Sequence, residues 1–162
     1  MSTTPIDQLP RIDAMPVEHL CDIAVDLQPA QVIPTHTGLR MTYLATGGEV
    51  SGPALQGEIL PGGGDWLLIG ADGVGRVDVR VTIRTHDAVL IHLHSRGVIR
   101  VPADGLQRLT DGHSLPFAQT YIRTTPMFET ADPRYDWLAG LVAVGYNVLS
   151  PGHVDYRVYR IS

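Results

Sequence analysis

The chain has 162 residues, the size of one domain that buries about two-thirds of the surface its unfolded form exposes. Its hydrophobic fraction of 44% and charged fraction of 18% are typical of a globular soluble protein. The net charge of -5 and a pI near 5.7 exclude a basic nucleic-acid-binding domain, which would cluster lysine and arginine on one face.

The N-terminus lacks the basic and apolar segments of a secretion signal, and no run reaches the ~20 apolar residues of a membrane-spanning helix. We therefore expect a flexible segment over residues 1–15, one domain over 16–162, a cytoplasmic location and no membrane contact. Cys21 is the only cysteine, so an intrachain disulfide and a cysteine metal cluster are both excluded.

Alternating polar and apolar residues predict most of the structure, because successive side chains of a strand point to opposite sides. Strands are expected over 17–27, 39–46, 54–60, 66–69, 75–86, 89–101, 120–125, 141–148 and 154–161, with glycine and proline turns between them. Short helices are expected over 102–109 and after Asp132-Pro133, an N-cap followed by proline at the first helical position. Short strands at hairpin spacing predict an all-β antiparallel barrel or sandwich.

The predicted hairpin over 75–101 carries the most informative pattern. One face holds valine and isoleucine, and the other holds a set of polar residues: Arg76, Asp78, Arg80, Thr82, Arg84, His92, His94 and Arg96. This polar face is either an ordinary exterior or the wall of an enclosed pocket. A turn with an odd number of residues at Asp87-Ala88-Val89 keeps each face uniform and places Arg84 opposite His92.

Several segments together resemble one family. They are Pro61 to Trp66, Val79 to Asp87, Tyr121 to Thr130, Tyr135 to Leu138 and Tyr156 to Tyr159. In this order they resemble the bacterial and fungal DUF3237 proteins, also called UPF0311, from about Val17 onward. The resemblance implies an antiparallel lipocalin-like β-barrel with a central cavity and implies no reaction. His92, Val81 and Ala139 depart from the expected family pattern, so a ligand typical of the family need not be the ligand here.

Ten residues are candidates for a site in that cavity. Asp65, His92, His94 and Arg123 are the candidate catalytic residues, and Trp66, Arg84, Tyr43, Glu58, Tyr121 and Glu129 the candidate substrate-binding residues. Each has a structural alternative: Asp65 caps a glycine turn, the aromatic residues pack in the core, and Arg123 pairs with a carboxylate such as Glu129 or Asp65. His92 and His94 also have the spacing of metal ligands, but no third ligand is singled out, and we expect no bound metal.

The sequence excludes several reaction classes. It has no G-x-S-x-G elbow, no phosphate-binding loop and no lysine for a Schiff base. What remains is proton transfer by Asp, Glu or His with Arg or Tyr stabilising charge. We expect a cofactor-independent cyclase, isomerase or lyase acting on an oxygenated apolar or aromatic metabolite. A non-catalytic small-molecule carrier and a homodimeric scaffold with an incidental cavity stay open as alternatives.

Overall fold

The computed structural model describes residue 6 and residues 9–162. In this part of the chain, ten strands form a single antiparallel sheet: β1(Val17–Leu27), β2(Gln31–Thr35), β3(Gly38–Ser51), β4(Gly57–Ile59), β5(Gly64–Gly70), β6(Gly75–Thr85), β7(Leu90–Arg100), β8(Tyr121–Glu129), β9(Ala143–Ser150) and β10(His153–Ile161). The helical segments are short: α1(Gly105–Thr110) and the 3-10 turns η2(Phe117–Gln119) and η3(Asp136–Gly140). The expected flexible segment over 1–15 falls partly on residues 1–5, 7 and 8, outside the described residues.

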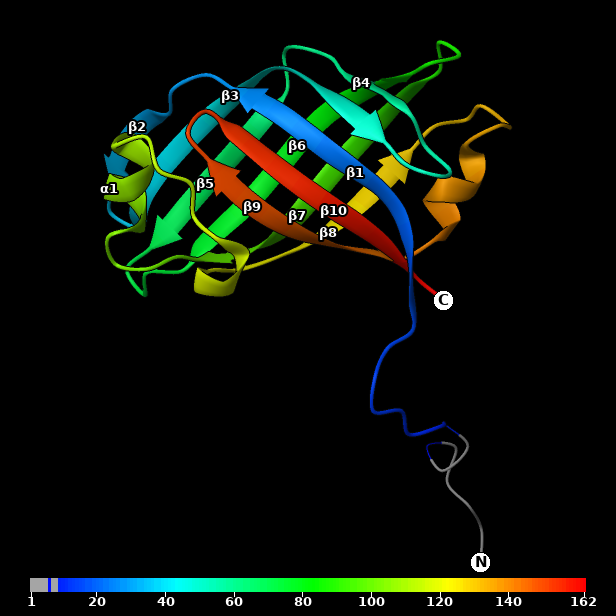
Figure 1. Ribbon diagram of the computed structural model, residues 1–162, viewed down its shortest axis with the longest axis horizontal. Helices are drawn as coiled ribbons and strands as arrows, with labels where there is room; N and C mark the ends of the chain where they lie inside the picture. The colour runs from blue at the N-terminus through cyan, green and yellow to red at the C-terminus, as the bar shows by residue number, and fades with distance from the viewer. Residues whose placement is uncertain (1–5, 7–8) are drawn as a thin grey trace, which may run out of the picture.

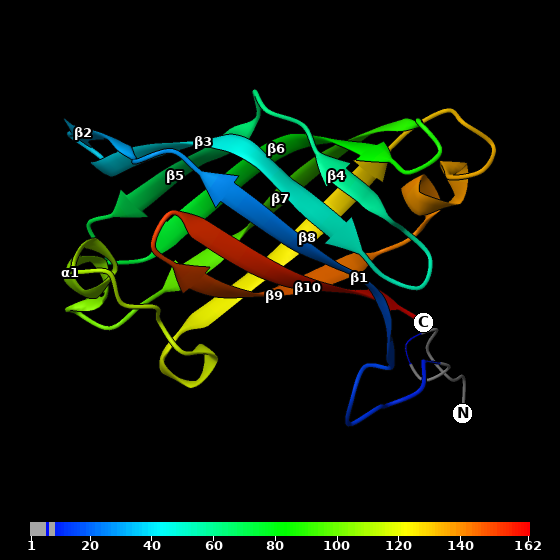
Figure 2. The ribbon, with the colours of Figure 1, turned by 45° about the horizontal axis from the view of Figure 1, so that its top comes forward.

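The sheet closes into a barrel (Figure 1; Figure 2). Strands follow the order β1-β10-β9-β8-β7-β6, β5 joins β6 to β3, and β3 returns to β1. Eight strands make the closed ring. Outside it, β2 pairs with the first residues of β3, and β4 pairs with both β3 and β6. The all-β antiparallel barrel with short helices is confirmed. No helix in residues 9–162 is long and apolar enough to span a membrane.

Strand alternation decides which side chains fill the barrel. Val77, Val79, Val81 and Ile83 of β6 are buried inside, and the arginines between them point outward. The apolar face is therefore the interior, and the hairpin's polar face is an exterior surface. The interior of an eight-stranded barrel is just wide enough for its own side chains to fill it. A set of charged side chains on the inner face would be buried there without water, which disfavours that arrangement.

The register of this hairpin differs from the expected one by two residues. Thr85 and Val89 close the loop, so it contains His86, Asp87 and Ala88. Arg84 lies opposite Leu90, not His92, and His92 lies opposite Thr82. The odd loop length is confirmed, and with it the uniform faces, but the sequence placed the loop one residue too late.

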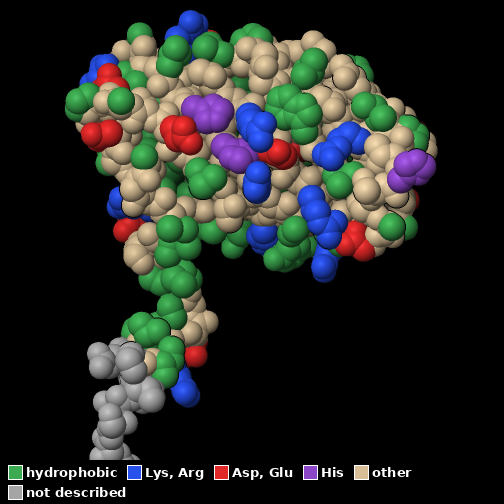
Figure 3. Space-filling view, turned by 180° about the vertical axis from the view of Figure 1, so that it is seen from behind, with side chains coloured by type: hydrophobic (Ala, Val, Ile, Leu, Met, Phe, Trp, Pro, Cys, Tyr) green, Lys and Arg blue, Asp and Glu red, His purple; other side chains and the backbone are tan. Residues whose placement is uncertain are grey.

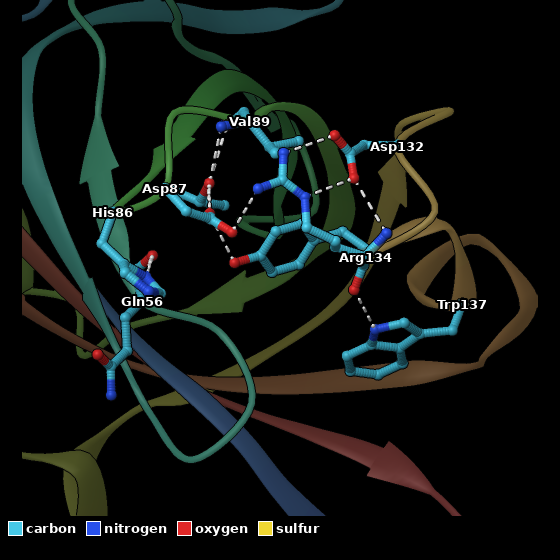
Figure 4. Close-up of polar contacts among 9 residues, drawn as sticks. Gln56, His86, Asp87, Val89, Asp132, Arg134 and Trp137 are labelled. Carbon is cyan, nitrogen blue, oxygen red and sulfur yellow. Dashed lines mark hydrogen bonds and ion pairs between the residues drawn. The ribbon is translucent and has the colours of Figure 1, made fainter.

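One end of the barrel is sealed by apolar side chains and a polar network. Leu55, Phe128 and Leu138 are fully buried there. The polar network links the β6–β7 loop to the segment before η3 (Figure 4): Asp87 accepts hydrogen bonds from the Thr85 hydroxyl (2.6 Å) and the Tyr135 hydroxyl (2.8 Å), and it pairs with Arg134 (2.9 Å). These bonds fix the segment around η3 to the β6–β7 loop, so this end is shut.

Candidate functional site

A ring of inward-facing residues crosses the middle of the barrel. Tyr43 of β3 lies opposite Asp65 of β5, Asp65 lies opposite Val79 of β6, and Val79 lies opposite Ser95 of β7. Paired residues of neighbouring strands share a face of the sheet. The buried Val79 therefore places Tyr43, Asp65 and Ser95 on the lumen face as well.

Asp65 is a carboxylate held inside this apolar lumen. Its Oδ1 accepts one hydrogen bond, 3.0 Å from the backbone nitrogen of Asp78. Burial raises the pKa of Asp65 to about 6, against the smaller lowering effect of that hydrogen bond, and the nearby charge of Asp78 raises it slightly further. A single backbone donor does not replace the lost water. Near neutral pH the carboxyl is thus able both to donate and to accept a proton.

Two tyrosines share the lumen with Asp65. Burial, with the charge of Asp65 as a second cause, raises the pKa of both Tyr43 and Tyr156. Tyr156 lies on β10 opposite Asn147 and Ile23, so it faces inward beside the core. Both phenols therefore stay protonated at neutral pH and remain hydrogen-bond donors.

Three further polar atoms in the interior have no partner within the described residues. They are Ser95 Oγ, Thr124 Oγ1 and Asn147 Oδ1. A buried polar atom without a hydrogen bond costs about 1–3 kcal/mol, so such atoms are rare in folded proteins. Three of them facing the lumen of Asp65 make this interior a candidate site for a polar ligand group.

The lumen is small in this conformation. It contains a cavity of about 20 Å³ lined by Ile23, Val25, Val79, Val81, Leu93, Ser95, Thr124, Pro126, Tyr156 and Val158, and Asp65 and Tyr43 are not among these lining residues. That volume holds about one water molecule. Opposite the sealed end, Leu39, Ile69, Ile99 and Leu149 are only partly buried. Along β5, Ile69 is four residues from Asp65, or about 13 Å of strand.

The structure separates the ten predicted site residues. Only Tyr43 and Asp65 face the lumen. Trp66 follows Asp65 on the same strand and therefore points outward. His92 is exposed, and Arg84 pairs with Glu58 on the surface, with about half of each side chain exposed. The expectation that Asp65, Trp66, Arg84, His92, His94 and Arg123 converge in one cavity is wrong.

His94 also lies on the outer face, with its Nε2 2.9 Å from Asp78 Oδ1. Figure 3 shows histidine and arginine side chains together on the outside of the barrel. Glu129 lies opposite His92 on β8 and is exposed. Among the residues described, no three His, Cys, Asp or Glu side chains gather closely enough to hold a metal ion.

Arg123 has neither of the expected carboxylate partners. Its guanidinium lies against three rings on the outer surface, with its Cζ 4.3 Å from the centroid of Tyr146, 4.6 Å from Tyr121 and 5.2 Å from Phe117. Its Nη1 donates to the carbonyl of Ile122. Tyr121 is therefore a surface residue too, and neither residue reaches the lumen.

A family model described as "Protein of unknown function (DUF3237)" matches residues 15–161. The chain belongs to the DUF3237 family. A UPF0311 protein of Clostridium acetobutylicum is 31% identical over 125 residues, which cover 77% of this chain and 79% of that protein. Among solved structures, the protein of unknown function RPA1785 from Rhodopseudomonas palustris has a TM-score of 0.87 at 24% identity, covering 93% of this chain and 100% of that one.

A second solved structure is described as an enzyme from Penicillium herquei. It has a TM-score of 0.69 at 21% identity, and the match covers 94% of this chain and 98% of that one. At this identity the likeness shows the fold alone. Of the three positions where the chain departs from the expected DUF3237 pattern, Val81 lines the lumen, whereas His92 and Ala139 are exposed.

Four lumen residues with polar groups were not among the sequence candidates: Tyr156, Ser95, Thr124 and Asn147. Ser95 carried a usable signal, because it is the one polar residue on the apolar face of its predicted strand. Tyr156 carried one too, because it alternates with Val154 and Val158 on the apolar face of its predicted strand, whereas the direction of Asn147 became clear only from the pairing of β9 with β10.

Proposed function

We propose that this protein is a cofactor-independent enzyme of the cyclase, isomerase or lyase type, acting in the barrel lumen on an oxygenated apolar or aromatic metabolite. The observation that carries the proposal is the Asp65 carboxyl, half-buried and with a pKa of about 6, beside two protonated phenols. A catalytic acid or base works best when its pKa is near the operating pH. A displaced pKa in an enclosed site is a recognised sign of function.

The roles follow from the charge states. Ionised Asp65 would take a proton from a carbon next to a carbonyl group, and the electron pair of that C–H bond would become the double bond of an enolate. Tyr156 or Tyr43 would donate a hydrogen bond to the enolate oxygen, where the negative charge develops. Protonated Asp65 would then return the proton to another carbon or to a leaving group. His92, His94 and Arg123 have no part in these steps.

The size of the cavity sets a condition on this function. Ligand pockets usually measure about 300–1,000 Å³, far above the 20 Å³ of the cavity in the lumen. The lumen must therefore widen before the reacting group can enter. The mainly apolar lining also favours the second candidate, a carrier that binds the same ligands without reaction.

Proton exchange on 2-tetralone tests the proposal, because this ketone combines an aromatic ring with an acidic carbon. In D₂O, the protein should accelerate loss of the NMR signal of its α-protons. Asp65→Asn should reduce the acceleration by about 10²- to 10⁴-fold with little change in ligand affinity. The rate should rise with pH through about 6, because the ionised carboxylate is the base.

Glu58→Gln is the matched control, since it removes a carboxylate on the outer face. It should exchange at the wild-type rate. Equal rates in Asp65→Asn and wild type would contradict the assignment. Binding of 2-tetralone without exchange would support the carrier, and absence of both would leave the lumen as an incidental part of a scaffold.

A further inference from the structure

An apolar segment precedes the barrel in the chain and is exposed to solvent. We call residues 9–16 the N-terminal arm. Leu9, Ile12 and Met15 are 64%, 55% and 56% exposed, and they lie within seven residues of one another in the sequence. Figures 1 and 2 show the arm leading away from the barrel, and Figure 3 shows its hydrophobic side chains standing clear of the surface.

The arm has the pattern of a docking peptide. Its large aliphatic residues recur every third position, with Pro10 after the first of them and Pro16 after the last. In a polyproline II helix three residues complete a turn, so Leu9, Ile12 and Met15 would share one side. The family match begins at residue 15, so most of the arm lies outside the domain that the family shares.

The barrel carries an aromatic surface of the kind that binds such peptides. The rings of His19, Tyr159, Tyr146 and Phe117 follow one another at centroid distances of 5.9, 5.9 and 5.7 Å. Tyr121 adjoins them through Arg123. We call these five rings the aromatic belt. Phe117, Tyr121 and Tyr146 are each more than 40% exposed. Proline-rich segments dock in aromatic-lined grooves.

The arm carries Arg11 and Asp13 and so has no net charge, and its Asp13 is opposite in charge to Arg123 of the belt. Arg123 lies inside the belt and forms no ion pair with any described carboxylate. Asp13 lies on the arm between Ile12 and Met15 and is likewise in no ion pair within residues 9–162. Arginine and tyrosine are also the residues most enriched among binding hot spots.

We propose that the chain forms a homodimer by exchanging arms, with the arm of each copy lying across the aromatic belt of the other and Asp13 pairing with Arg123. The arm leaves the barrel where the Pro16 carbonyl accepts a hydrogen bond from the Ser162 nitrogen, and every residue from 9 to 16 is exposed to solvent. Its own barrel therefore does not hold it. A twofold axis gives both arms the same environment and closes the assembly.

Sedimentation velocity of the full chain tests the exchange. The wild type should sediment as a dimer that dissociates on dilution. Leu9→Ser with Ile12→Ser should yield the monomer, whereas the control Val32→Ser with Ile33→Ser, which removes apolar side chains of similar exposure from β2, should leave the dimer intact. Asp13→Arg and Arg123→Asp should each weaken the dimer, and their combination should restore it. A monomeric wild type, or a dimer indifferent to the arm variants, would overturn the proposal.

Disulfide trapping locates the arm. Ile12→Cys and Tyr121→Cys proteins are prepared separately and mixed under mild oxidation, and the native thiol does not interfere because Cys21 is buried. A covalent dimer containing one chain of each variant is the expected product. A third protein carries both substitutions in one chain. If a disulfide forms only within that chain, the arm docks on its own barrel and the exchange is disproved. Neither result depends on the lumen chemistry.

Discussion

Asp65 shows how two opposing effects set the chemistry of one residue. The hydrogen bond from the Asp78 nitrogen favours the ionised carboxylate, but burial opposes it more strongly. On the outer face the balance is reversed: Asp72, paired with Arg76 and bonded to the Val74 nitrogen, has a pKa lowered to about 2. Two aspartates on one hairpin therefore differ because only one of them faces the lumen.

The displaced pKa predicts how stability depends on pH. The Asp65 carboxyl binds its proton more tightly in the folded protein than in the unfolded chain. Its contribution to the free energy of unfolding is therefore fully present below pH 4 and is lost as pH rises through about 6. Asp65→Asn removes this loss of stability at higher pH, because asparagine does not ionise. The variant should gain stability over the wild type between pH 5 and 7.5, by on the order of 1–3 kcal/mol, since one pKa unit corresponds to about 1.4 kcal/mol.

Urea unfolding at several pH values measures this difference. Glu58→Gln supplies the baseline, because its carboxylate is half exposed and no comparable gain is expected. A constant difference between Asp65→Asn and wild type over the whole range would show that Asp65 has an ordinary pKa. The supposed proton-transfer role would then lose its physical basis.

At the scale of the strands, buried hydroxyls serve two different purposes. The Thr85 hydroxyl joins the β6–β7 loop together, accepting from the Val89 nitrogen at 2.9 Å and donating to Asp87 at 2.6 Å. The Thr124 hydroxyl on β8 has no partner within the described residues. The first is a structural group, and the second is available to a ligand.

Isosteric replacement separates the two. Thr85→Val should destabilise the protein by about 1–3 kcal/mol, because the buried Val89 nitrogen loses its acceptor. Thr124→Val should be neutral or stabilising, because it removes an unsatisfied group without changing the volume. It should also weaken 2-tetralone binding if the lumen is the site. Thermal unfolding of the two variants decides the first point, and an equal loss of stability in both would contradict this division.

Strand patterns predicted the fold but only part of the site. Alternation alone gave the strands and showed that Arg84 and His92 share a face, because a period of two is a local property. It could not say which face was inside. Asp65 was found because a lone acid beside a glycine turn is conspicuous, whereas Asn147 is placed inside only by the pairing of β9 with β10, which sets it opposite Tyr156. The short strand β2, whose fourth residue is Pro34, was missed because proline argues against pairing.

The barrel as a whole is closed unevenly. The ladder between β6 and β7 has ten residue pairs, and the ladder between β7 and β8 has nine. Between β8 and β9 only Arg123 with Tyr146 and Thr124 with Gly145 are paired. Pro126 of β8 has no N–H to donate. This seam adjoins the lumen, since Thr124 and Pro126 line the cavity.

A weak seam beside a small cavity predicts where the barrel gives way. Local opening occurs where few backbone hydrogen bonds must break, so peptides covering 124–130 and 142–146 should exchange their amide hydrogens faster than peptides covering 76–84 and 90–99. Hydrogen exchange read by mass spectrometry measures this directly. Bound 2-tetralone should slow exchange at the seam more than at the sealed end around Thr85, because a ligand in the lumen packs against Thr124 and Pro126. Uniform protection of all four peptides would show that the seam is as stable as the rest of the wall, and the lumen would then have to widen at the rim of Leu39 and Ile69 instead.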